Sequence, residues 1–204
     1  IIMPVYNERR TIEQILSMVR AVPIEKEIIV VDGNSTDGTR EILKEQEKFE
    51  DTKVIYENCR SGRGFAQKQG IKAAVGDIII FQDADLELDP AQYPELLKPI
   101  MDGRAQVVFG SRFLGKEHNL PPFKKRVLLP LARLFNWFFL GVRFNDPQNG
   151  FRALSADAAQ RINWQQDRMA HCSEILWLTR LTGIKYQEVG VTVHYSHFGQ
   201  QMSG

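Results

Sequence analysis

The sequence has only two cysteines in 204 residues, and this scarcity excludes several classes of protein. Cys59 and Cys172 lie far apart and outside any C-x-x-C pattern, so we expect neither a disulfide framework nor a structural zinc site. No run of 18 or more apolar residues is present, which excludes a transmembrane helix within these residues. Lysine and arginine number 26 against 25 acidic residues, and this near balance argues against a nucleic-acid-binding protein.

Apolar residues make up 43% of the chain, enough for a packed core, and in the first half short β-rich runs alternate with helical patterns. A helix is predicted to begin at Thr11, with Gln14 placed for a capping box. The predicted strands are residues 1–5, 28–31, 54–56, 78–81 and 107–109. This alternation predicts an α/β fold, with a mostly parallel central sheet and helices on both faces, as in Rossmann-like proteins.

After Ser111 the pattern becomes more helical. Residues 124–140 are predicted to form an amphipathic helix with a wide aromatic face, kinked at Pro130. Further helices are expected over 155–162 and 173–181, followed by a final strand in which Val189, Val191, Val193 and Tyr195 alternate. We therefore expect a single domain over residues 1–204 with a C-terminal helical elaboration. Trp137, Trp164 and Trp177 are expected to pack in the core or at an interface.

Basic charge is concentrated in the middle of the chain. Residues 104–143 hold eight basic residues and one acid, Glu117, so the remainder of the chain is net acidic. A solvated surface would explain such a stretch. Its position beside the aromatic amphipathic segment favours a surface for phosphates or anionic lipid headgroups.

Polar, turn-forming sequence follows three of the predicted strands, at residues 4–8, 31–38 and 82–85. Open parallel sheets bind ligands beyond the carboxyl ends of their strands, so these segments predict one shared site. Asp83 and Asp85, two residues apart, face the same side of an extended segment and can approach one hard cation, Mg²⁺ or Mn²⁺. Glu87 continues the spacing as a further ligand or a water-mediated partner. An ordinary acidic turn is the alternative.

Two other strand ends carry candidate binding residues. Asp32 is placed to hydrogen-bond a nucleobase or ribose, although capping of its own turn is the alternative. Arg112, after Gly110 and Ser111, suits bidentate phosphate contact, with a structural salt bridge as the alternative. The Gly62-Arg63-Gly64 segment matches neither a P-loop nor a dinucleotide fingerprint, which excludes the usual kinase and dehydrogenase interpretations.

Together these motifs resemble glycosyltransferase family 2, whose members have the glycosyltransferase-A fold. The matching segments are Pro4-Val5-Tyr6-Asn7-Glu8, residues 30–39, residues 74–77, Asp83-Ala84-Asp85-Leu86-Glu87, Gly110-Ser111-Arg112-Phe113, residues 146–152, Glu174 and residues 188–191. The Gly-Ser-Arg turn and the Asp-x-x-x-Gly-Phe-Arg segment look like those of polyprenyl-phosphate (dolichyl-phosphate) mannosyl or glucosyl synthases. One departure is Gly33, where many members have a second aspartate.

The resemblance implies roles for individual residues. Residues 1–112 would form the nucleotide-sugar-binding half and 113–204 the acceptor side. The nucleoside would be held by Pro4, Tyr6, Glu8 and Asp32. The catalytic group would be Asp83, Asp85 and Arg112, in which the two aspartates, with Glu87, engage the metal and diphosphate and Arg112 stabilises phosphate charge.

On the acceptor side, the resemblance implies a polyprenyl phosphate lipid, contacted by Ser111, Lys124 and Arg126. The 124–140 helix would lie at the membrane surface, although its apolar face could also pack on the sheet or on a second copy of the chain. The expected location is cytoplasmic and peripheral at the inner, cytoplasmic face of the membrane, with any anchor outside these residues.

The expected reaction is hexose transfer from a UDP- or GDP-linked sugar to the lipid phosphate, with inversion. Because a phosphate acceptor is already ionised at pH 7, no strong general base is needed. A family-2 transferase acting on a glycan hydroxyl is one alternative, and Asp146 is then the candidate base. A sugar-phosphate nucleotidyltransferase is disfavoured because no glycine-rich activating loop lies near the first strand. A non-catalytic nucleotide-sugar-binding scaffold is disfavoured by the intact Asp83/Asp85 pair.

Overall fold

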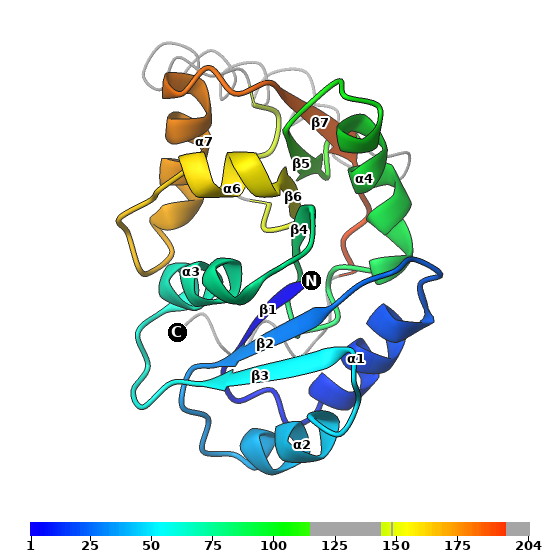
Figure 1. Cartoon of the computed structure of the whole chain (residues 1–204), viewed down its shortest axis with the longest axis vertical. Helices are drawn as coiled ribbons and strands as arrows, with labels where there is room; N and C mark the ends of the chain where they lie inside the picture. The colour runs from blue at the N-terminus through cyan, green and yellow to red at the C-terminus, as the bar shows by residue number, and fades with distance from the viewer. Residues whose placement is uncertain (115–143, 148, 195–204) are drawn as a thin grey trace, which may run out of the picture.

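The fold is built on one seven-stranded sheet, seen in a computed structural model that describes residues 1–114, 144–147 and 149–194. The strand order is β3-β2-β1-β4-β6-β5-β7. The strands are β1 (Ile2–Val5), β2 (Ile28–Asp32), β3 (Thr52–Tyr56), β4 (Ile78–Phe81), β5 (Val107–Ser111), β6 (Arg152–Ser155) and β7 (Tyr186–Gly190). In Figure 1 the sheet runs from β3 at one end of the molecule to β7 at the other.

Most neighbouring strands are parallel, as predicted. The exception is β6, which pairs antiparallel with both β4 and β5. The sequence analysis did not predict this strand, because its four residues follow a loop rather than a helix and are too few to show alternation. β6 brings the loop before it to the carboxyl end of β4, since Phe81 pairs with Arg152.

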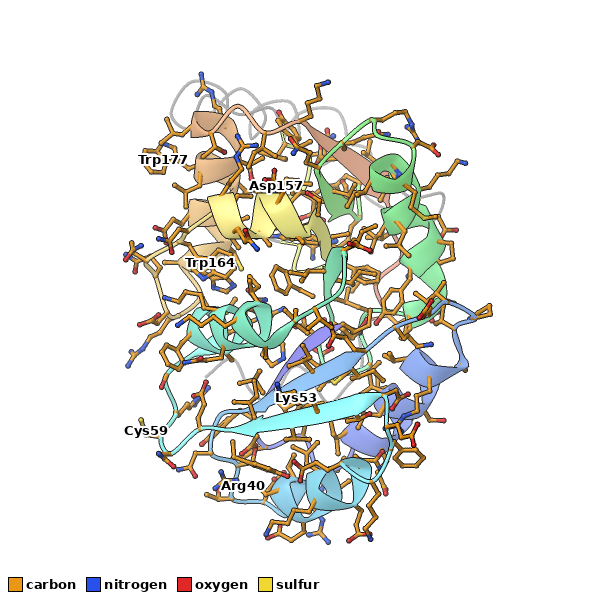
Figure 2. The ribbon with its side chains drawn as sticks, viewed as in Figure 1. Arg40, Lys53, Cys59, Asp157, Trp164 and Trp177 are labelled. Carbon is orange, nitrogen blue, oxygen red and sulfur yellow. The ribbon has the colours of Figure 1, made fainter. Side chains whose placement is uncertain are left out.

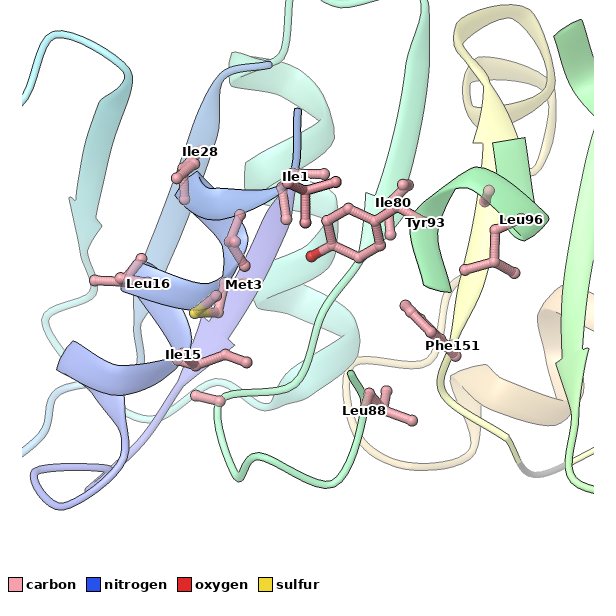
Figure 3. Packing of buried hydrophobic residues seen from close by; sticks show 14 of the residues in the cluster. Ile1, Met3, Ile15, Leu16, Ile28, Ile80, Leu88, Tyr93, Leu96 and Phe151 are labelled. Carbon is pink, nitrogen blue, oxygen red and sulfur yellow. The ribbon is translucent and has the colours of Figure 1, made fainter. Parts of the chain in front are cut away.

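Helices cover both faces of the sheet (Figure 1). They are α1 (Ile12–Ala21), α2 (Thr39–Gln46), α3 (Arg63–Ala73), α4 (Tyr93–Met101), α6 (Ala156–Arg161) and α7 (His171–Leu181), with a 3-10 turn, η1, over Pro90–Gln92. One core cluster holds residues of α1 and α4 and the other residues of α6 and α7. Figure 3 shows the first cluster, where Leu16 of α1 and Leu96 of α4 pack with sheet residues such as Met3 and Ile80. All five residues of β2 are buried, which explains its unbroken apolar run.

Several local expectations need correction. Thr11 makes no side-chain cap on α1; its hydroxyl instead donates to the Glu8 carboxylate at 2.9 Å. The last strand, β7, begins and ends earlier than predicted, and of the alternating valines only Val193 forms a bridge beyond it, with Leu88. Trp164 is buried as expected, but Trp177 is 48% exposed and points outward from α7 (Figure 2).

The predicted 124–140 helix and Trp137 lie outside the described residues. In the part of the chain that the structure describes, no helix combines the length and apolar character needed to cross a membrane.

Candidate active site

A cavity of about 560 Å³ lies at the carboxyl ends of β1, β2 and β4. This is the edge at which the sequence predicted a shared site. It is closed by the start of α3 and by the loop that precedes α7. The residues that line it are Pro4, Val5, Tyr6, Glu8, Gly33, Arg60, Gly62, Arg63, Ala66, Asp83, Ala84, Asp85, Arg168 and Met169. The structure therefore brings together Pro4, Tyr6, Glu8, Asp83 and Asp85, five of the predicted site residues.

Asp83 and Asp85 place two carboxylates in the cavity wall. Burial, and next the charge of Asp83, raise the pKa of Asp85 to about 7. The Asp85 carboxylate also accepts a hydrogen bond from the backbone N–H of Glu87 at 3.0 Å. A divalent cation bound beside the two carboxylates would favour the ionised form of Asp85.

The structure does not gather Glu87 with the two aspartates into a three-carboxylate metal site. Glu87 does not line the cavity, and no group of three potential ligand side chains occurs within the described residues. Burial, followed by the charge of Asp83, raises the pKa of Glu87, so it lies within electrostatic range of the site. A metal bound by Asp83 and Asp85 would take its remaining ligands from the substrate or water.

Arg63, a residue that the sequence analysis did not place in the site, forms an ion pair with Asp83. It is the first residue of α3, and its buried Nε has no hydrogen-bond partner within the described residues. Gly150 makes this arrangement possible, because a Cβ there would lie 2.7 Å from Arg63 Nη2 and 3.1 Å from Asp83 Oδ2. The glycine before Phe151 thus leaves room for the Arg63–Asp83 pair, and a side chain there would have to displace the Arg63 guanidinium.

Two more arginines reach the cavity. The Arg60 guanidinium lies 4.0 Å from the centre of the Tyr6 ring, in a cation–π contact. Arg168 comes from the loop before α7. The residue before it, Asp167, packs its backbone carbonyl against Gly62. At Gly62 the φ is +114° and a Cβ would lie 2.5 Å from that carbonyl, so the first glycine of Gly62-Arg63-Gly64 serves close packing. Of the three arginines at the cavity, only Arg63 lies in a segment that the sequence analysis singled out, Gly62-Arg63-Gly64.

Asp32 lies beside the cavity rather than in its lining. Its carboxylate is fully buried, accepts the N–H of Ser35 at 3.2 and 3.3 Å, and pairs with Arg40 Nε at 2.9 Å. Arg40, which is labelled in Figure 2, comes from α2 and also donates to the Glu57 carbonyl at 3.2 Å. The turn-capping contact is therefore present, and nucleoside contact by Asp32 stays a prediction.

Arg112 forms a salt bridge with Asp146. A structural salt bridge was the alternative to the phosphate contact predicted for Arg112. Arg112 Nε and Nη2 donate to the two Asp146 oxygens at 2.7 and 2.8 Å, and its backbone N–H donates at 3.0 Å. Asp146 is 3% exposed and its own N–H donates to Glu188. A carboxylate held by these donors is poorly placed to act as a general base.

Among the remaining acceptor-side candidates, Ser111 is the one that the structure describes, and it does not line the cavity. Ser111 is fully buried, and its hydroxyl has no hydrogen-bond partner within the described residues. Lys124 and Arg126 lie outside the described residues.

His171 beneath the site predicts a pH dependence of folding. Its Nδ1 lies 2.6 Å from the Arg168 carbonyl, and burial lowers the pKa of the imidazole to about 4. Between about pH 6.5 and pH 4 the unfolded chain therefore binds a proton that the folded one does not, and stability falls as the pH falls. Relative to His171→Asn, the wild type should lose about 2 kcal/mol of unfolding free energy between pH 7 and pH 5. Urea unfolding at both pH values measures this, and equal losses in the two proteins would contradict it.

The model of Glycosyl transferase family 2 matches residues 1–162. The chain belongs to this family. This confirms the resemblance to glycosyltransferase family 2 that was drawn from the motifs.

Curated relatives within family 2 include transferases of three organisms. The chain is 31% identical over 176 residues to dolichol-phosphate mannosyltransferase of Pyrococcus furiosus, covering 79% of this chain and 47% of that protein. It is 29% identical over 199 residues to the low-salt glycan biosynthesis hexosyltransferase Agl6 of Haloferax volcanii, covering 95% and 47%. Polyprenol monophosphomannose synthase of Mycolicibacterium smegmatis is 28% identical over 215 residues, covering 100% and 80%. The chain thus spans about half the length of the first two relatives.

Solved structures confirm the glycosyltransferase-A fold. Glucosyl-3-phosphoglycerate synthase from Mycobacterium tuberculosis, in complex with Mn²⁺, uridine diphosphate (UDP) and phosphoglyceric acid, superposes with a TM-score of 0.70 at 22% identity, covering 98% of this chain and 71% of that one. TarS 1–349 of S. aureus in complex with UDP superposes with a TM-score of 0.67 at 17% identity, covering 96% of this chain and 59% of that one. At these identities the likeness concerns the fold.

A family-2 donor site predicts a measurable role for Asp32. Asp32→Ala should weaken binding of the nucleoside diphosphate by about 1–3 kcal/mol, because a buried polar contact loses its partner. Arg40→Met is the matched variant, since it removes the other half of the ion pair and keeps the carboxylate. Calorimetry and thermal unfolding separate the roles: normal binding by Asp32→Ala together with a lower melting temperature would leave Asp32 as a turn cap only.

Proposed function

We propose that the protein is a metal-dependent, inverting glycosyltransferase that moves a hexose from a nucleotide sugar to a polyprenyl phosphate lipid. The observation that carries this proposal is a single cavity lined by Asp83 and Asp85 together with Arg60, Arg63 and Arg168. Carboxylates suit a divalent cation, and guanidinium groups suit phosphate oxygens. A metal-bound nucleoside diphosphate needs both.

On the donor side, Pro4, Tyr6 and Glu8 hold the nucleoside with Asp32 behind them. The flat Tyr6 ring, already contacted by Arg60, offers a surface on which a base stacks. Gly33 leaves space beside the ring, because a Cβ there would lie in contact with it, 3.8 Å from Tyr6 Cδ2. These contacts tolerate either a uracil or a guanine base.

Mg²⁺ or Mn²⁺ fits the two aspartates, since its charge would offset the burial and the charge of Asp83 that together raise the pKa of Asp85. When bound there it would act as a Lewis acid and offset charge that develops on the departing nucleoside diphosphate. Arg63, now paired with Asp83, is placed to give its free donors to the same diphosphate. Relatives crystallised with Mn²⁺ and UDP support this choice of ligands.

The acceptor is a lipid phosphate in this proposal, in line with the names of the Pyrococcus and Mycolicibacterium relatives. A phosphate oxygen attacks without prior deprotonation, and the described cavity lining contains no histidine that would serve as a base. The engagement of Asp146 by Arg112 disfavours the glycan-hydroxyl alternative. Lys124 and Arg126 would meet the lipid phosphate, and the basic 104–143 stretch would hold the protein at the cytoplasmic membrane surface.

Product analysis tests the proposal. The protein is incubated with UDP-glucose or GDP-mannose, Mg²⁺ or Mn²⁺, and a short polyprenyl phosphate, and products are identified by mass spectrometry. We expect one donor to give a polyprenyl-phosphate hexose, with no product when EDTA is added. Transfer only to glycan hydroxyls would replace the acceptor assignment, and nucleotide binding without any transfer would favour a non-catalytic role.

A further inference from the structure

The loop that carries the two aspartates is closed by one buried side chain, that of Gln82. Its Nε2 donates to the carbonyl of Asp83 at 2.9 Å and to the carbonyl of Leu88 at 3.0 Å. One amide therefore joins both ends of the segment that contains Asp83, Asp85 and Glu87. Gln82 is 0% exposed, so its amide group has no access to water and depends on these protein partners.

The second polar atom of the Gln82 side chain is also satisfied. Its Oε1 accepts the hydroxyl of Tyr93 at 2.9 Å, and Tyr93 is fully buried in the core cluster that includes Ile80 and Leu88 (Figure 3). Carbonyl oxygens only accept hydrogen bonds, so the N–H groups of the Gln82 amide must face Asp83 and Leu88, and its oxygen must face the Tyr93 hydroxyl. The first residue of α4 thus completes the hydrogen bonds that hold Gln82 in this orientation.

Within this ring the backbone is constrained. Leu86 has a φ of +66°, in the left-handed region that non-glycine residues rarely adopt. Asp85 Oδ1 accepts the Glu87 N–H, and the Glu87 carbonyl accepts the His194 N–H at 2.8 Å. A loop held in such a conformation keeps two like-charged carboxylates together only if its ends are fixed.

We propose that Gln82, oriented by Tyr93, is a positioning residue that fixes the Asp83–Asp85 loop in its metal-binding conformation. This inference rests on the proposed metal site. Gln82 does not line the cavity, so it acts through the two aspartates. Loss of a hydrogen-bond partner behind a metal ligand typically lowers metal affinity by about 10–100-fold.

The test measures Mn²⁺ affinity by electron paramagnetic resonance of free Mn²⁺, in the presence of UDP or GDP. Gln82→Met keeps the volume and removes both donors, and we expect its Mn²⁺ affinity to fall about tenfold or more. Tyr93→Phe leaves both N–H donors of Gln82 in place, so its Mn²⁺ affinity should fall less than that of Gln82→Met. Thr179→Val is the control, because it removes an equally buried hydrogen bond, 2.7 Å to the Ile175 carbonyl, in α7. It should lower the melting temperature and leave Mn²⁺ affinity unchanged.

The outcomes are distinguishable. If the wild type binds no Mn²⁺ with either nucleotide, the proposed metal site fails and this inference fails with it. If the wild type binds and Gln82→Met binds equally well, only the role of Gln82 is overturned. Should Gln82→Met not fold, NMR of the wild type decides: adding Mg²⁺ and UDP should shift the Gln82 side-chain amide signals, and unchanged signals would overturn the proposal.

Discussion

Asp85→Asn should reduce turnover by about 10²–10³-fold, the usual cost of removing one group that stabilises transition-state charge. The asparagine keeps the size of the side chain and can still accept the Glu87 N–H, so only the negative charge is lost. Because burial raises the pKa of Asp85 to about 7, the ionised carboxylate disfavours folding above that pH. The variant should therefore be at least as stable as the wild type at pH 8. Steady-state kinetics with saturating Mn²⁺, and thermal unfolding at pH 8, measure the two effects.

Asp77→Asn provides the control, since Asp77 is exposed and precedes the same strand, β4, at its opposite end. It should leave turnover unchanged. Full activity in Asp85→Asn, or a loss of activity that simply follows a loss of stability, would refute the assigned role of Asp85.

Arg63→Met should change metal binding and nucleotide binding in opposite directions. Without the guanidinium, Asp83 keeps an uncompensated charge, so Mn²⁺ alone should bind more tightly. The nucleoside diphosphate loses a charge-assisted donor and should bind about 10- to 100-fold more weakly. Titrations of Mn²⁺ alone, and of UDP or GDP with saturating Mn²⁺, measure both.

Lys68→Met is the matched control on α3, because Lys68 also forms an ion pair, with Asp167, but does not line the cavity. It should leave both affinities near those of the wild type. If Arg63→Met lowers the two affinities together with the melting temperature, Arg63 only holds the fold.

The sequence predicted the sheet well where the strands are long apolar runs. β2 is buried on both faces and β4 follows the same rule on three of its four residues, so hydrophobicity alone reveals them. It did not reveal β6, whose Arg152 is 2% exposed and donates to the carbonyls of Asn149, Cys172 and Pro147. A buried arginine satisfied by backbone oxygens depends on distant parts of the chain, and no local pattern reports it.

The donor site could be predicted only in part, because some of its residues come from distant segments of the chain. Asp83 and Asp85 are found from the sequence because they follow the apolar run of β4, although the strand ends at Phe81 and the two aspartates lie in the loop after it rather than in an extended segment. Arg63 lies 20 residues before Asp83, and Arg168 enters from a loop near the other end of the chain. Their approach depends on how α3 and the loop before α7 pack, and the glycines that permit it resemble ordinary turn residues in the sequence. Tertiary packing, rather than spacing, decides these positions.

Calorimetric titration of UDP and GDP, each with and without Mn²⁺, tests the central claim most directly. The claim is that Asp83 and Asp85 hold a cation that the nucleoside diphosphate needs in order to bind. We expect one of the two nucleotides to bind at least about tenfold more tightly with Mn²⁺, and this difference to vanish in Asp85→Asn. Equal affinity with and without the metal for both nucleotides would contradict the account.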